Sequence, residues 1–176
     1  MSWSEPMARI AAIALMLGAL GACGFEPLYA RHDGDNIAAQ LETVRIEPIA
    51  DRVGQMLHNR LRDGLTPRGL PTKPLYYLKV TVTESVQESV IQRTAFAARA
   101  NLSLNVSYQL HDAKSRGSVH SGSIRSTSSY SYQTATLGTL AGEKDARERA
   151  VTDAAEQIRA QLALYFKRDV IDSRRD

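Results

Sequence analysis

A cysteine preceded by small residues, Leu20-Gly21-Ala22-Cys23, is the pattern with the clearest chemistry in this sequence. It follows one basic residue, Arg9, and an apolar run over residues 10–20, which is far shorter than the ~20 residues needed to span a bilayer. This order is typical of a bacterial lipoprotein signal. We expect the Cys23 thiol to receive a diacylglycerol and its freed amine a third acyl chain. These chains provide the two or more anchors that stable membrane attachment requires. The alternative, a buried cysteine in an apolar N-terminal helix, would not need this order of features.

The residue after the cysteine indicates which membrane holds the anchor. Gly24 stands where an Asp commonly retains lipoproteins at the inner membrane. We therefore expect a lipid-anchored protein in the inner leaflet of the outer membrane, facing the periplasm.

Length and charge favour one globular domain. Removing the 22 signal residues from the 176 of the chain leaves 154, close to the commonest domain size. The net charge of +3 is unchanged by that cleavage, since the signal holds one acid and one base. This mildly basic balance is far from a nucleic-acid-binding signature. The chain has one cysteine, so no disulfide can form within it and the fold must depend on its core.

Known catalytic and metal-binding motifs are missing from the sequence. The four histidines, His32, His58, His111 and His120, are far apart and none has a partner at a metal-ligand spacing. The stretch between Gly117 and Gly122 lacks a nucleophile elbow, and no phosphate-binding glycine loop precedes a helix. We expect no metal, no cofactor and no enzymatic activity, although a triad assembled in space would leave no such trace.

Composition divides the chain into four segments. We expect a cleaved signal over residues 1–22, a tether over 23–40 without sustained periodicity, one domain over 41–168 and a flexible tail over 169–176.

The domain begins with a predicted strand and helix. Val44 and Ile46 alternate with polar residues and predict a short strand that Pro48 ends or confines to a sheet edge. A helix should follow, capped by Asp51 and ending near Gly64.

Three further segments, residues 75–86, 98–111 and 119–132, show the two-residue period of half-buried strands. The middle one alternates apolar and polar side chains without a break, which no helix could bury on one side. The phase of the last one slips at Ser121-Gly122-Ser123, where we expect a bulge. The short connection at residues 112–117 favours an antiparallel meander.

The last element is the strongest predicted helix, with one apolar stripe from Val151 to Phe166. The order β-α-β-β-β-α predicts an α+β fold. In it a four-stranded, mostly antiparallel sheet carries two helices on one face, since each helix has a single apolar stripe.

The sheet face opposite the helices is predicted to be polar but poor in charge. Its centre holds Asn101, Ser103, Asn105 and Ser107. Amides and hydroxyls of this kind can meet another polar protein surface through direct and water-bridged hydrogen bonds. The equally weighted alternative is that they are ordinary solvent-facing strand residues.

Three arginines are candidates for binding an acidic ligand. Arg93 lies between the second and third strands, Arg99 opens the polar face of the third strand, and Arg125 lies in the fourth. Guanidinium groups suit bidentate contact with phosphate. For each single arginine an ordinary solvated surface position is the favoured alternative, because isolated basic side chains are common on soluble proteins.

Several of these motifs together resemble a known family. They are Cys23-Gly24-Phe25-Glu26-Pro27-Leu28-Tyr29, Ala97-Ala98-Arg99-Ala100-Asn101-Leu102, Val106-Ser107-Tyr108-Gln109-Leu110, Ser129-Tyr130-Ser131-Tyr132 and Ala154-Ala155-Glu156-Gln157-Ile158. The chain resembles the LPS-assembly lipoprotein family LptE, most closely its alphaproteobacterial form, over almost all of the mature sequence.

The resemblance implies an accessory, non-catalytic role. LptE proteins plug the large outer-membrane β-barrel LptD and help lipopolysaccharide (LPS) reach the cell surface, so LptD and LPS are the implied partners. Large barrels have polar lumens, which suits the charge-poor face. Two other classes stay open on the residues alone: a lipoprotein auxiliary to an ABC-type envelope transporter, and an anchored envelope hydrolase.

The lipid anchor gives the first prediction. A Cys23→Ser protein should lose incorporation of a radiolabelled fatty acid, because the thiol is the acceptor, whereas the wild type should begin at an acylated Cys23. Intact-mass analysis checks both, and an unmodified Cys23 in mature wild-type protein would contradict the expectation.

Overall fold

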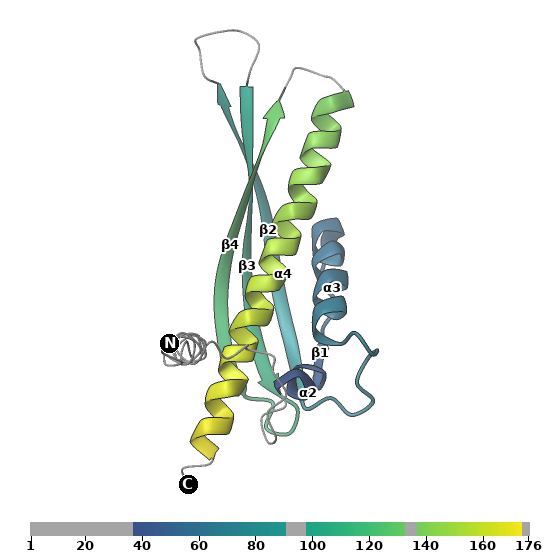
Figure 1. The fold of residues 1–176 in the computed structure, drawn as a ribbon, viewed down its shortest axis with the longest axis vertical. Helices are drawn as coiled ribbons and strands as arrows, with labels where there is room; N and C mark the ends of the chain where they lie inside the picture. The colour runs from purple at the N-terminus through teal and green to yellow at the C-terminus, as the bar shows by residue number, and fades with distance from the viewer. Residues whose placement is uncertain (1–36, 91–97, 133–136, 174–176) are drawn as a thin grey trace, which may run out of the picture. The chain divides into compact units, whose positions relative to one another are not determined.

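The computed structural model describes residues 37–90, 98–132 and 137–173, and the fold over these ranges is α+β, as predicted (Figure 1). The elements in chain order are α2 (Ile37–Leu41), β1 (Val44–Ile46), α3 (Asp51–Leu65), β2 (Tyr76–Val90), β3 (Ala98–Asp112), β4 (Ser118–Tyr132) and α4 (Leu137–Ser173).

The strands of the described ranges form one mixed sheet in the order β1-β2-β3-β4. β1 is parallel to β2, with Val44 opposite Tyr76, while β2, β3 and β4 are antiparallel neighbours. β2, β3 and β4 each have 15 residues, so each extends for about 50 Å. β3 is central over its whole length, whereas β4 forms an edge of the sheet.

Helices cover one face of this sheet. α4 packs on β3 and β4, and α3 packs beside α4 near β1 and β2 (Figure 1). Every second residue of β3 from Ala100 to Leu110 is buried under the helices. The stripe expected on the last helix is buried as well, and small alanines such as Ala146, Ala150 and Ala154 bring α4 close to the strands. The two-helix layer on one sheet face is therefore confirmed.

The described structure has a short helix, α2, that was not predicted, and its last helix is longer than predicted. α2 includes residues 37–40 of the predicted tether, because Ile37 and Leu41 are buried in the core. α4 begins at Leu137 and ends at Ser173, so it also includes residues 169–173 of the predicted tail. The first turns of α4 have few large apolar side chains. The apolar stripe that predicted the helix begins only at Val151, so the start of the helix at Leu137 could not be predicted from it.

The predicted cap of α3 was wrong by one residue. The N-cap is Ala50, whose methyl group cannot cap, and Asp51 is the first residue of the helix. A carboxylate in the first turn still interacts favourably with the positive end of the helix dipole.

The predicted bulge at Ser121-Gly122-Ser123 was also wrong. The register shift lies between Leu110, which pairs with His120, and His111, which pairs with Ser118, so Val119 is the extra residue. Gly122 has a different role, because a Cβ there would lie 2.6 Å from the Tyr108 hydroxyl oxygen. The glycine makes room for a tyrosine ring across the strand pair.

The buried stripes give a stability prediction. Leu104→Ala and Ile158→Ala should each lower the free energy of unfolding by about 2–5 kcal/mol, because both side chains are fully buried. Leu164→Ala is the matched control, since that leucine on the same helix is 46% exposed and should cost far less. Chemical denaturation measures the free energy of unfolding of all three variants. Equal losses of this free energy at Leu104, Ile158 and Leu164 would contradict the assignment of Leu104 and Ile158 to the buried core.

Candidate interaction surface

The sheet face away from the helices, here called the open face, is polar along its whole described length. It carries four cations, Arg45, Lys79, Arg99 and Arg125, and no carboxylate among the residues of its described strands. Its other members include Thr81, Thr83, Ser85, Asn101, Ser103, Asn105, Ser107, Gln109, Ser123, Thr127 and Ser129. The strand register therefore places the four predicted interface residues, Asn101, Ser103, Asn105 and Ser107, side by side on one surface.

Cross-strand hydrogen bonds hold the side chains of the open face. Ser129 Oγ donates to Asn101 Oδ1 at 2.7 Å, and Arg125 Nε donates to Asn105 Oδ1 at 2.9 Å. Ser103 and Thr127 share a hydrogen bond of 3.1 Å between their hydroxyls. These bonds occupy the amide oxygens of both asparagines, and the NH₂ groups are the donors of the same side chains. A partner would meet donors that are already ordered, which lowers the entropy cost of binding.

The three candidate arginines do not form one compact cluster among the described residues. Arg99 is exposed near the start of β3, and Arg125 lies opposite Asn105, six residues further along β3. That separation corresponds to about 20 Å along the strand. Arg93 lies outside the described residues.

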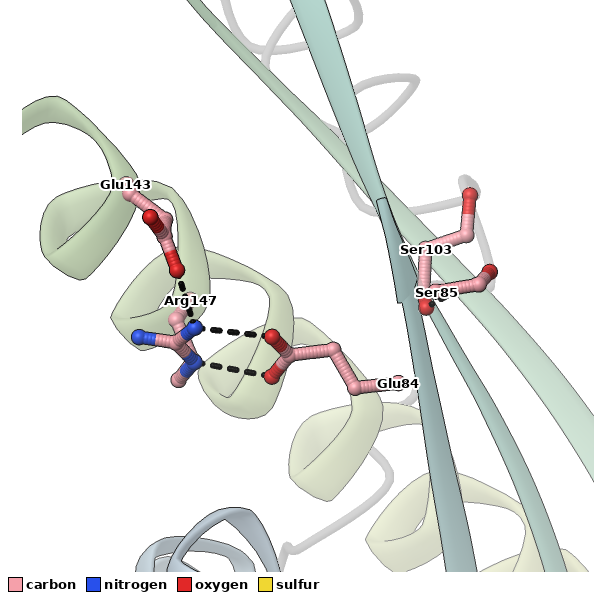
Figure 2. Close-up of polar contacts among 5 residues, drawn as sticks. All are labelled: Glu84, Ser85, Ser103, Glu143 and Arg147. Atoms are coloured by element: carbon pink, nitrogen blue, oxygen red, sulfur yellow. Dashed lines mark hydrogen bonds and ion pairs between the residues drawn. The ribbon is translucent and has the colours of Figure 1, made fainter. Parts of the chain in front are cut away.

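A charged cluster on the helix side of the sheet joins α4 to β2 (Figure 2). Arg147 of α4 donates to both carboxylate oxygens of Glu84, with distances of 2.8 Å and 2.7 Å, and also to Glu143 Oε1 at 2.6 Å. Figure 2 shows Ser85, the next residue of β2, pointing to the opposite side together with Ser103. The two faces of β2 thus make different contacts. Glu84 binds Arg147 of α4 on the helix side, and Ser85 belongs to the open face.

The hydrogen bonds to Glu84 raise the pKa of the Arg147 guanidinium above its usual value, with a further contribution from Glu143. The side chains of Arg147 and Glu84 are only 21% and 20% exposed, so solvent screens this pair less than a surface ion pair. Sequence reasoning did not identify this cluster. The available signal was Glu84 itself, a charged residue at an inward position among the valines of β2.

Polar side chains also join α4 to the edge strand β4. Ser126, only 2% exposed, donates its hydroxyl to Asp153 at 2.6 Å. Arg149 donates to Ser128 Oγ and to the backbone carbonyl of Ser129, both at 3.2 Å. These contacts fix α4 along β4 and leave the open face to the other side of the sheet.

An aromatic cluster fixes the second half of α4 to the sheet. The His120 ring stacks on Tyr165 with centroids 5.0 Å apart, and the Tyr108 hydroxyl contacts both His120 and Gln161. Burial, with a smaller effect of Arg168, lowers the pKa of His120, and burial raises that of Tyr108. His120 thus has a structural role here.

A metal site and a membrane-spanning helix each place requirements on the described ranges. Residues 37–90, 98–132 and 137–173 contain no group of three or more side chains that could hold a metal ion. No helix in these ranges is long and apolar enough to cross a membrane.

This fold, a long sheet covered by helices on one face and open on the other, is found in bacterial lipoproteins. A chain from Caulobacter crescentus CB15 described as a lipoprotein superimposes with a TM-score of 0.62 at 25% identity, covering 74% of this chain and 96% of that one. A minor lipoprotein from Acinetobacter baumannii shares the fold with a TM-score of 0.53 at 21% identity, over 69% of this chain and 91% of the other.

The family model LptE, described as lipopolysaccharide-assembly, matches residues 41–162, and the chain therefore belongs to this family. A protein from Rickettsia prowazekii (strain Madrid E), RP188, is 25% identical over 149 residues, which cover 85% of this chain and 92% of that protein. The family consists of non-enzymatic lipoproteins of the cell envelope, so the resemblance noted from the sequence is confirmed.

The Arg147 cluster gives a prediction for the energetics of the helix layer. Arg147→Leu should lower the free energy of unfolding by about 1–3 kcal/mol, because it leaves the half-buried Glu84 carboxylate without its partner. The double variant Arg147→Leu, Glu84→Leu should recover part of that loss. Thermal denaturation measures both.

Lys144→Ala is the control for that experiment. Lys144 forms an exposed ion pair with Glu148 at 3.9 Å, which contributes little in water. A loss at Lys144 as large as that at Arg147 would contradict the assigned role of the cluster.

Proposed function

We propose that this chain is an outer-membrane lipoprotein that assists LPS assembly as the plug and partner of an LptD-type β-barrel, with the open face as its main contact surface. The observation that carries the proposal is the chemistry of that face. It presents ordered hydroxyl and amide groups over about 50 Å of strand without a carboxylate among its described residues.

The chemistry of the open face fits the interior of a large barrel. Barrel lumens are lined by polar side chains, which can exchange hydrogen bonds with Asn101, Ser103, Asn105 and Ser107 directly or through water. Short hydroxyl side chains permit close approach of a partner because they are small. They also lose less rotamer entropy on binding than lysine or glutamate. The predominance of small polar groups and the absence of carboxylates from its described strands favour a contact surface over a purely solvated face.

The lipid anchor is part of the proposal. Cys23 holds the protein in the inner leaflet of the outer membrane, and Gly24 avoids the signal for retention at the inner membrane. Anchoring confines the search for the barrel to the membrane that contains it.

We further propose that LPS binds directly through Arg93, Arg99 and Arg125. The cations of the open face attract an anionic ligand without opposition from a neighbouring carboxylate in the described part of that face. Arg99 and Arg125 lie too far apart for a single phosphate, so they contact different acidic groups of one large headgroup.

The open face is tested by placing two charges on it. The double variant Ser103→Lys, Asn105→Lys should reduce co-purification of the barrel at least tenfold, because two long cations cannot be accommodated in a close polar interface. The lipidated proteins are isolated from detergent-solubilised outer membranes, and the barrel is quantified by mass spectrometry.

The control variant carries two lysines on the outer surface of α3, Gln55→Lys and Asn59→Lys, where both residues are exposed. It should retain the barrel if the open face is the main contact. Normal barrel yield from the open-face variant, with both variants folded by circular dichroism, would return this face to a solvated role.

A further inference from the structure

Two connections at one end of the fold form a surface that combines cations with exposed leucines. The connection between α3 and β2, residues 66–75, holds Arg68, Leu70, Lys73 and Leu75, and the turn between β3 and β4, residues 113–117, holds Lys114 and Arg116. We call these six residues the basal surface.

Hydrogen bonds place the two connections next to each other. The backbone N–H of Ala113 donates to the carbonyl of Leu75 at 2.9 Å, and the N–H of Leu75 donates to the carbonyl of Thr43 at 3.1 Å. Figure 1 shows both connections at the end of the sheet where α2 lies. The six side chains therefore belong to one end of the domain.

The basal surface is rich in positive charge. Neither connection contains an Asp or Glu. Of the nearby acids, Glu42 already pairs with Arg68 at 3.4 Å, and the Asp112 carboxylate accepts the N–H groups of Lys114 and Ser115. Asp169 of α4 is a further acid at this end. Lys73, Lys114 and Arg116 are all exposed and can meet anions.

The same surface exposes large apolar side chains. Leu70 is 61% exposed and Leu75 is 49% exposed, on either side of Lys73. Leucines between cations are the combination found where a protein touches the boundary between headgroups and acyl chains. A surface that contacts only solvent would be expected to expose fewer leucines and to include acidic residues.

The segment that leads to the lipid anchor enters the domain at the same end as the basal surface. The chain leads from α2 back to Cys23, and the 14 steps between Cys23 and Ile37 reach at most about 50 Å when fully extended. The chain from Cys23 therefore enters the described domain at the end that carries α2. An anionic membrane lies within reach of the basal surface once Cys23 is acylated.

We propose that the basal surface is a second membrane contact, which binds the anionic phospholipid headgroups of the leaflet that holds the Cys23 lipid. Lys73, Lys114 and Arg116 contact phosphates, and Leu70 and Leu75 enter the headgroup region. The contact orients the open face relative to the membrane. The proposal uses the anchor assigned above but requires neither LPS nor the barrel.

The test uses the chain from residue 23 onwards with Cys23→Ser, so that no acyl chain contributes to binding. It is sedimented with vesicles of equal parts phosphatidylethanolamine and phosphatidylglycerol, or of phosphatidylcholine alone. The protein should bind the anionic vesicles and be released by salt. The triple variant Lys73→Gln, Lys114→Gln, Arg116→Asn should bind on the order of a hundredfold more weakly, from roughly fivefold for each cation. Asn suits position 116, where φ is 56°.

The matched control removes the same charge elsewhere, with Arg52→Gln, Arg62→Gln and Lys144→Gln on α3 and α4, and should bind like the parent. If both triple variants weaken binding to the anionic vesicles equally, binding depends only on the net charge of the protein, which would overturn the proposal. Equal binding to both vesicle types, or release by inorganic phosphate beyond the effect of chloride at the same ionic strength, would overturn it as well. Because these vesicles contain no LPS or barrel, failure here leaves the proposed function untouched, and failure of barrel co-purification leaves this proposal untouched.

Discussion

The alternation of side chains along β3 is the constraint on which the rest of the structure depends. Because successive residues of a strand point to opposite faces, its apolar and polar residues must separate into two surfaces. β3 is the central strand, paired on both sides from Ala98 to His111, and so it imposes this division on β2 and β4. A shift of one residue would bury Asn101 and Asn105 and expose Leu102 and Leu104, and the register is therefore strongly determined.

The helix layer depends on that division in two ways. Alanines on α4 allow close packing on the apolar side of β3 and β4, which provides the hydrophobic stabilisation. Polar contacts then fix the position of the helix: Arg147 with Glu84 towards one end, Ser126 with Asp153 in the middle, and the His120–Tyr165 stack towards the other end. Together they hold a helix of 37 residues along the whole sheet. The opposite face remains available for a partner.

Most of the architecture could be predicted because it rests on periodicity. The two-residue period of residues 98–111 and the helical stripe from Val151 to Phe166 specify which side chains are buried, and both were confirmed. The sequence predictions failed at positions whose role depends on residues far away in the chain. Gly122 resembled a bulge in the sequence, but its small size serves the ring of Tyr108, which is distant in the chain. The Arg147–Glu84 pair spans 63 residues and could not be read from local spacing. The facing of the candidate interface followed from the strand period, whereas its cross-strand hydrogen bonds required the register.

The central claim is that the open face is a protein interface, and in-cell photocrosslinking tests it most directly. A photoreactive residue at Ser107, which is exposed on the open face, should form an adduct between this lipoprotein and a large outer-membrane β-barrel. The same group at Asn59, on the outer surface of α3, reports on the opposite side of the molecule. A barrel adduct from Ser107, identified by mass spectrometry, is the predicted result. A barrel adduct from Asn59 with none from Ser107 would contradict the account.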